Sequence, residues 1–192
     1  MKNIVIAGAG KGIGLKTVEL LKDTNQLFTI ARNNTAELSA LSTKFYQLDL
    51  VTDNLDALND LPETIDGLVY CPGSINLKPF NRLTTQDFLN DFNQNVLGAV
   101  SLVQKLLPNL KRAGGASIVL FSTVAAKLGM PFHASVAATV LNNTMLAPPA
   151  LFKFGNNFCT RLTAPITFWL KSFKKSRAVN LLNGFKLIEP GQ

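Results

Sequence analysis

Apolar runs of four to six residues alternate with longer segments of mixed hydrophobic and polar residues through the first part of the chain. Short apolar runs are typical of strands buried on both faces, whereas the longer segments have the spacing of helices. Such alternation predicts an α/β fold with a doubly wound parallel sheet. The predicted strands cover residues 3–7, 27–31, 44–48, 67–70 and 116–121, and the predicted helices cover 12–22, 35–41, 55–61, 85–93 and 94–111.

Individual residues mark two helix boundaries. Thr84 is followed three residues later by Asp87, a pattern that predicts a capped helix start. Pro108 lacks a backbone N–H, so we expect the helix over 94–111 to bend or end near it. Prolines and glycines then interrupt every apolar segment after about residue 139, which predicts an incomplete or irregular C-terminal part.

The size and composition of the chain fit one cytoplasmic domain. With 192 residues, 47% of them hydrophobic, the chain can bury a single sizeable core. No apolar run has the length of a membrane span, and the first three residues lead into a strand without a signal peptide, so we expect no membrane partner. Cys71, Cys159 and the single His133 lack the spacing of metal ligands, so no metal site is expected.

The net charge of +7 is concentrated in a basic tail, which we do not interpret as a separate domain. Residues 1–150 contain 12 Lys and Arg against 11 Asp and Glu, whereas residues 151–192 contain 7 against 1. Aromatic residues interleave with these bases, so the tail could bind a membrane surface or single-stranded nucleic acid, or be a poorly packed extension that favours self-association. No Asp or Glu occurs between Asp91 and Glu189, which an out-of-frame translation of residues 139–192 would also explain.

The first predicted strand runs directly into a glycine-rich turn, residues 8–14, followed by a helical segment. Glycines let the backbone approach a pyrophosphate, and the N–H groups at a helix start face its charge, so the turn predicts a dinucleotide site. The spacing Gly8-x-x-x-Gly12-x-Gly14 resembles the T-G-x-x-x-G-x-G pattern of the short-chain dehydrogenase/reductase family, with Ala7 in place of Thr. The resemblance covers residues 1–138 and implies a Rossmann-like NAD(P)-binding domain.

The residues after the predicted strands indicate which cofactor is bound. Arg32 stands where a basic residue accepts the 2′-phosphate of NADP, and Lys11 adds a second charge, so NADP is expected rather than NAD unless both are ordinary solvated charges. By resemblance, Asp49 is the family's adenine-contacting Asp, although a turn or helix-cap role explains it equally well. The expected cofactor-binding residues are Gly8, Gly10, Lys11, Gly12, Ile13, Gly14, Arg32, Asp49, Leu50 and Gly73.

The family's catalytic positions are only partly kept. By resemblance, Asn95 matches the structural and proton-relay Asn, and Thr123 falls at the catalytic Ser. Val136 and Val140 stand where the Tyr that exchanges the proton and the Lys that lowers its pKa are expected, and valine has no ionisable group. His133 lies about one helical turn earlier without a nearby carboxylate to orient it, so we expect a loop residue there.

Two functions remain open at this point. The resemblance implies an NAD(P)-dependent oxidoreductase that moves a hydride between nicotinamide and a small alcohol or carbonyl compound. The alternative is a catalytically inactive NAD(P)-binding relative, or a frameshifted or truncated product, that lacks the Tyr-x-x-x-Lys pair. Family members often form tetramers, so a homo-oligomer is an expected assembly, and nucleic acid is not an expected partner.

Overall fold

The computed structural model describes residues 1–121, 123 and 125–141. The expectations for the basic tail beyond residue 141, including its binding, self-association and out-of-frame interpretations, lie outside these described residues. Within the described part, no helix is long and apolar enough to cross a bilayer. The fold described below is therefore that of the region in which the sequence predicts alternating strands and helices.

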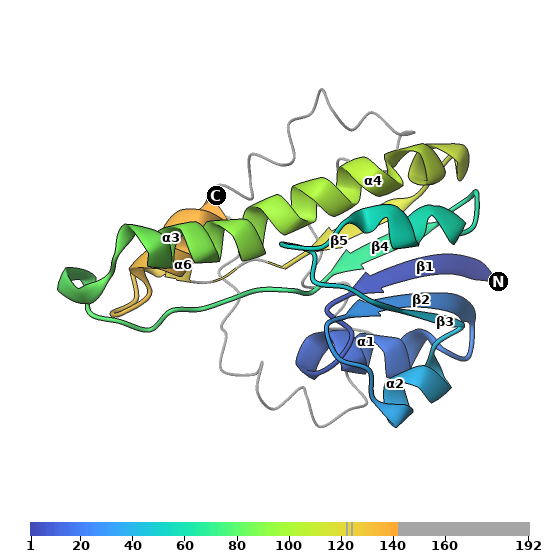
Figure 1. Cartoon of the computed structure of the whole chain (residues 1–192), viewed down its shortest axis with the longest axis horizontal. Helices are drawn as coiled ribbons and strands as arrows, with labels where there is room; N and C mark the ends of the chain where they lie inside the picture. Colours follow the sequence, from blue (N-terminus) through green and yellow to red (C-terminus); the bar gives the residue numbers. More distant parts are fainter. Residues whose placement is uncertain (122, 124, 142–192) are drawn as a thin grey trace, which may run out of the picture.

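Five parallel strands form one sheet in the order β3-β2-β1-β4-β5, which confirms the predicted doubly wound topology (Figure 1). The first strand lies at the centre, where Ile6 is aligned with Thr29 of β2 on one side and with Val69 of β4 on the other. Parallel neighbours need crossover connections, which the intervening helices supply. The strands are β1 (Lys2–Ala7), β2 (Asn25–Ala31), β3 (Lys44–Gln47), β4 (Gly67–Tyr70) and β5 (Ser117–Leu120).

Helices cover both faces of the sheet (Figure 1). Helices α1 (Gly12–Leu21) and α2 (Ala36–Leu41) lie on one face, and α4 (Gly98–Arg112) lies on the other. Alternate residues of β1 serve the two cores, because Val5 packs with the α4 side and Ile6 with the α1 side. A short 3-10 helix, η1 (Leu55–Asp60), stands where the sequence predicts a helix over 55–61.

The two helices predicted over 85–111 form one continuous rod. Helix α3 (Thr85–Phe92) passes into a π-helical turn, η3 (Asn93–Leu97), and then into α4. Of the two outcomes expected at Pro108, a bend or an end of the helix, an end is wrong, because α4 continues through Pro108 to Arg112. Buried Leu106 and Leu110 on either side of the proline hold this part of the helix against the core, which outweighs the cost of the missing N–H.

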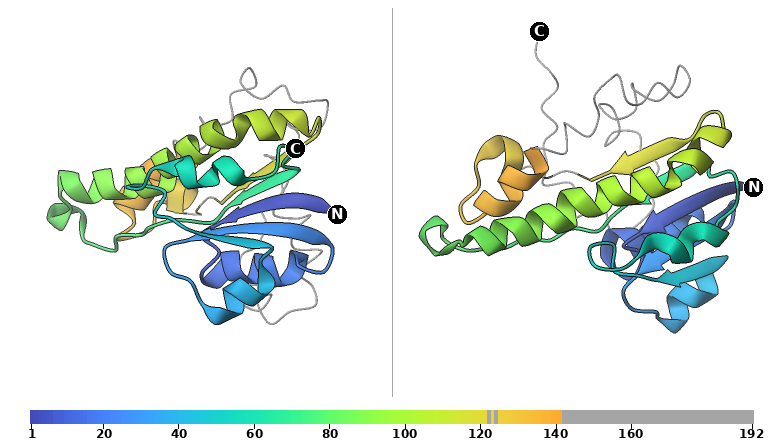
Figure 2. Two further views of the ribbon diagram at one scale, coloured as in Figure 1. Left: turned by 45° about the vertical axis from the view of Figure 1, so that its right-hand side comes forward. Right: turned by 45° about the horizontal axis from the view of Figure 1, so that its top comes forward.

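Three short helices complete the described fold. The sequence does not predict the 3-10 helix η2 (Phe80–Arg82) or α5 (Ala125–Leu128). Helix α6 (Ala134–Leu141) begins directly after His133, for which a loop position is expected. Figure 2 shows α6 lying beside α3, away from the strands, so these two helices extend the structure beyond one end of the sheet.

The predicted cap at Thr84 is confirmed and is part of a larger polar cluster. The Thr84 side chain accepts the backbone N–H of Asp87, and the Asp87 carboxylate accepts the backbone N–H of Thr84 at 2.9 Å. Lys78 Nζ lies 2.8 Å from Asp87 Oδ1, and the Asn76 amide donates to the same oxygen. These donors, Lys78 first, hold the pKa of the Asp87 carboxyl below its ordinary value.

Replacement of Asp87 by Asn tests this cluster. Because the folded-state pKa of Asp87 lies below the unfolded value of about 3.9, its contribution is complete above that pH and is lost as pH falls through the folded-state pKa. We expect Asp87→Asn to lower the urea midpoint at pH 7. Between about pH 4 and pH 2, the urea midpoint of this variant should fall less than that of the wild type. The same change at exposed Asp23 should leave both quantities near wild type. An equal fall of the urea midpoint at low pH in Asp87→Asn and in the wild type would contradict this account.

Candidate functional site

The glycine-rich turn is fixed between three strands. The N–H groups of Gly8 and Ala9 both donate to the Ile30 carbonyl of β2, at 2.8 and 3.2 Å. A Cβ placed on Gly8, whose φ is +72°, would lie 2.8 Å from the nitrogen of Pro72 after β4. A Cβ on Gly14 would lie only 2.1 Å from the Gly8 carbonyl oxygen. Both glycines are therefore required by backbone packing, which brings the start of α1 against the end of β1.

The start of α1 presents unpaired backbone donors. Among the described residues, no side chain caps this helix, and its first turn has no acidic residue. By contrast, Thr35 caps α2 through its side chain. Gly12 has a φ of +57°, and apart from its chain neighbours and the backbone of its own helix, no described atom lies within 4 Å of the position a Cβ would take. Exposed N–H groups beside open space at the positive end of a helix dipole are suited to hold a phosphate.

Two charged residues predicted to bind cofactor lie together at the same sheet edge. Arg32 follows β2 and is exposed, and its Nη1 atom lies 3.9 Å from Asp49 Oδ2. Asp49 also accepts the backbone N–H of Val51 at 2.9 Å, so its expected turn role is observed. The side chain of Leu50 is buried in the core on the α4 side of the sheet, so only its backbone could face a ligand.

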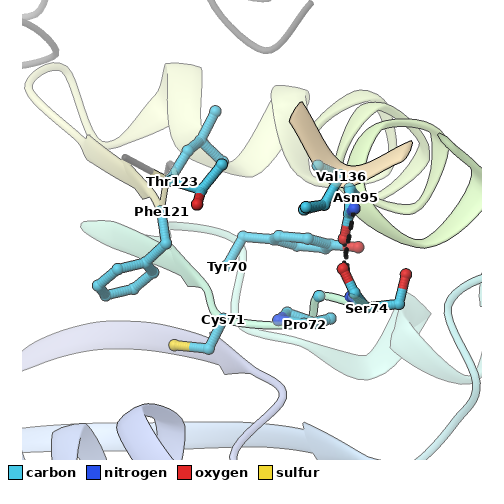
Figure 3. A pocket seen from close by; sticks show the side chains of 11 residues that line it. Tyr70, Cys71, Pro72, Ser74, Asn95, Phe121, Thr123 and Val136 are labelled. Carbon is cyan, nitrogen blue, oxygen red and sulfur yellow. Dashed lines mark hydrogen bonds between the residues drawn. The ribbon is translucent and has the colours of Figure 1, made fainter. Parts of the chain in front are cut away.

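A cavity of about 160 Å³ lies beyond the ends of β4 and β5, beside the π-turn (Figure 3). None of the described side chains that line it is charged at neutral pH. Burial raises the pKa of the Cys71 thiol to about 12, so this residue stays protonated and is a poor nucleophile. The lining residues are Tyr70, Cys71, Pro72, Gly73, Ser74, Asn95, Ala99, Leu120, Phe121, Thr123 and Val136.

Asn95 joins three segments at the edge of this cavity. Its Oδ1 atom accepts the Ser74 backbone N–H at 2.8 Å, and its Nδ2 atom lies 3.2 Å from the Ser74 carbonyl oxygen. The same Nδ2 donates to the Thr139 hydroxyl of α6, also at 3.2 Å, and that hydroxyl donates to the Val136 carbonyl. Asn95 thus ties the π-turn to the loop after β4 and to α6, and a Cβ on Gly73 would come within 3.4 Å of its oxygen.

The other predicted catalytic positions contribute one hydroxyl and one apolar wall. The Thr123 hydroxyl accepts the Ala125 N–H at 3.3 Å and lies on the cavity side in Figure 3. Val136 is buried and lines the cavity across from Tyr70. Val140 belongs to α6, but its side chain lies outside the described part. His133 bonds through Nδ1 with the Pro131 carbonyl at 2.6 Å and does not line the cavity.

Sequence reasoning missed three polar residues of the site. Tyr70 and Ser74 lie three residues before and one residue after Gly73, which the sequence analysis named as a cofactor-binding residue. Thr139 lies one turn after Val136 on α6. The Tyr70 hydroxyl donates to the Gln94 carbonyl at 2.8 Å. Burial, followed by the nearby Asp49 charge, raises the pKa of Tyr70, so this phenol holds its proton and its hydrogen bond.

Comparison with known proteins identifies one family. Residues 2–140 match the family model described as short chain dehydrogenase. Retinol dehydrogenase 8 from Homo sapiens is 29% identical over 153 residues, with 72% of this chain and 49% of that protein covered. The 2,3-dihydro-2,3-dihydroxybenzoate dehydrogenase of Escherichia coli K12 is 28% identical over 145 residues, covering 71% of this chain and 58% of that protein. The chain spans about half the length of these curated relatives.

Solved structures show the same architecture. A short chain dehydrogenase from Salmonella enterica has a TM-score of 0.67 at 20% identity, with 76% of this chain and 68% of that chain covered. A structure described as a short chain dehydrogenase/reductase family protein has a TM-score of 0.69 at 25% identity, covering 81% and 69%. These solved structures therefore share with this chain the arrangement of strands and helices.

The contact between Gly14 and Gly8 can be tested by adding one methyl group. Gly14→Ala would place its Cβ against a backbone carbonyl that cannot move aside, so we expect a loss of at least about 3 kcal/mol in unfolding free energy. Exposed Gly115 has no atom within 4 Å of its Cβ position and serves as the matched control, with Gly115→Ala expected within about 0.5 kcal/mol of wild type. Urea unfolding followed by circular dichroism measures both. Equal stabilities of the two variants would refute the packing argument.

Proposed function

Because the chain belongs to the short-chain dehydrogenase/reductase family, we propose that it binds NADP(H) at the carboxyl edge of its sheet. The observation that carries the proposal is the uncapped start of α1 beside the open position at Gly12, which suits the cofactor diphosphate. In this proposal residues 1–138 form the binding unit. The residues proposed to contact the cofactor are Gly8, Gly10, Lys11, Gly12, Ile13, Gly14, Arg32, Asp49, Leu50 and Gly73.

The preference for NADP over NAD rests on Arg32. Its side chain is 68% exposed, and its contact with Asp49 at 3.9 Å is loose enough to give way to a phosphate. Exposed Lys11, at the start of α1, would add a second positive charge. An acidic residue, which would favour the free ribose 2′-hydroxyl of NAD, is not present at position 32.

The residues of the site are better suited to bind NADP(H) than to exchange the proton that accompanies hydride transfer in the family. NADP(H), when bound, would supply or accept a hydride, and the family's Tyr would exchange the accompanying proton. Val136 has no proton to exchange, and the Tyr70 phenol, whose pKa is raised, is hydrogen-bonded to Gln94. We therefore propose a nucleotide-binding relative that does not turn over substrate through a tyrosine.

A second candidate is an oxidoreductase that acts on a small alcohol or carbonyl compound. It is favoured by the Thr123 hydroxyl on the cavity side, which could orient a carbonyl oxygen, and by the uncharged lining of the cavity. The name of the retinol dehydrogenase relatives also refers to an alcohol substrate. Since the chain spans about half of those proteins, their activity reaches this chain only as a proposal.

Replacement of Arg32 tests the cofactor preference. We expect Arg32→Ala to raise the dissociation constant of NADPH at least about tenfold, or about 1.4 kcal/mol, while that of NADH changes less than about threefold. Isothermal titration calorimetry with each nucleotide measures both constants. Arg82→Ala, which removes an exposed arginine of η2, is the control for lost net charge and should bind like wild type. Equal weakening of NADPH and NADH by Arg32→Ala would refute the preference for NADP.

Turnover separates the two candidate functions. We expect NADPH to bind to the full chain but not to be oxidised in the presence of a panel of ketones and aldehydes, because Val136 supplies no proton. NADPH fluorescence follows binding and consumption in the same sample. If oxidation is observed, the isosteric change Thr123→Val shows whether the hydroxyl orients the carbonyl. Oxidation that falls more than about tenfold in that variant, with NADPH binding unchanged, would establish the oxidoreductase and overturn our first choice.

A further inference from the structure

One buried hydrogen bond connects the end of β4 to the π-turn. Tyr70 is 4% exposed, and its hydroxyl donates to the Gln94 carbonyl at 2.8 Å. Figure 3 shows the Tyr70 ring extending from β4 across the cavity toward the segment that carries Asn95. Since Gln94 immediately precedes Asn95, the bond fixes the backbone next to the residue that joins the three segments of the site.

The π-turn explains why the Gln94 carbonyl needs this partner. In a regular α-helix the Gly98 N–H would donate to the carbonyl four residues earlier, which is that of Gln94. Here the Gly98 N–H donates to Asn93, five residues earlier. The Tyr70 hydroxyl takes the place of the donor that the π-turn moves away.

Gly98 is matched to the same hydroxyl. A Cβ at position 98 would lie 2.5 Å from Tyr70 Oη, well inside van der Waals contact. Glycine inside a helix costs about 1 kcal/mol relative to alanine, yet here it makes room for the phenol. Tyr70 and Gly98 therefore form a complementary pair, in which one supplies the hydrogen bond and the other the space.

We propose that Tyr70 is a positioning residue for Asn95, acting through the Gln94 carbonyl and dependent on glycine at position 98. The hydrogen bond holds η3 in its π-helical register, and this register directs the Asn95 amide toward Ser74 and Thr139. A shift back to α-helical register would rotate Asn95 away from both partners. The assignment concerns the geometry of the cavity itself and holds whether or not NADP(H) binds.

A double-mutant cycle on the full chain, without nucleotide, tests the pairing. We expect Tyr70→Phe to raise the unfolding equilibrium constant about tenfold, because it leaves the Gln94 carbonyl without its donor. Gly98→Ala should raise the unfolding equilibrium constant about a hundredfold or more in the wild-type background. In the Tyr70→Phe background the clashing oxygen is gone, so the same change should raise the constant by a factor that is at least tenfold smaller. Additive penalties would overturn the pairing. If Gly98→Ala alone does not fold, recovery of folding in the double variant supports the pairing, and failure to recover overturns it.

The side-chain amide signals of Asn95 distinguish positioning from general stability. These signals are assigned in ¹H–¹⁵N spectra by their loss in Asn95→Asp, and Tyr70→Phe is expected to move them. Tyr46→Phe is the matched control, because it removes the hydroxyl of another buried tyrosine, bonded to Asp60 at 2.7 Å, on the edge strand β3 far from the π-turn. It should lower stability without moving the Asn95 signals. Unmoved signals in Tyr70→Phe, or equal movement in both variants, would overturn the proposal.

Discussion

The approach of Gly14 to the Gly8 carbonyl is the constraint on which the site depends. It leaves no room for a side chain and so fixes the direction in which α1 leaves the central strand. Because β1 lies between β2 and β4, this direction points the positive end of the helix at the edge where both neighbouring strands also end. Arg32 follows β2 and Gly73 follows β4, whereas Asp49 follows β3, the next strand along the sheet. All three residues therefore lie at the carboxyl ends of parallel strands.

The proposed binding and catalytic parts of the site are carried by different elements. The glycine turn and Arg32 belong to the β1-α1-β2 unit, whereas Thr123 and Val136 belong to the segments after β5. Helix α1 packs on one face of the sheet with Ile6 and Leu27, whereas α6, which carries Val136, packs against α3. A valine at position 136 therefore changes the chemistry of the cavity without disturbing the helix start that faces a phosphate. In the proposed function, this separation allows nucleotide binding to persist without the tyrosine that exchanges the proton.

The sequence predicts the strands within two residues. The central strands β1 and β4 are short apolar runs bounded by polar residues or turns, as burial on both faces requires. The edge strand β3 has polar residues at both ends and is only partly buried. The continuation of α4 through Pro108 could not be predicted from the neighbouring sequence, because it depends on the packing of Leu106 and Leu110 in the core. The π-turn has no signature of its own, because its register depends on a hydrogen bond from Tyr70, 24 residues earlier. The role of Thr139 could not be predicted either, because its hydrogen-bond partner Asn95 lies 44 residues away in the sequence. The spacing that singled out Thr123 and Val136 names two residues that line the same cavity, although their roles there stay predictions.

The central place of β1 has a consequence for the nascent chain. In the folded sheet β1 pairs with β2 and with β4, so one of its two partners, residues 67–70, is synthesised about 36 residues after the other. During that interval a strand containing Val5 and Ile6 presents open hydrogen-bonding groups and apolar side chains to the surroundings. The yield of native protein therefore depends on how fast the intervening residues are translated. It also depends on whether a chaperone binds the side of β1 that is still without its partner β4.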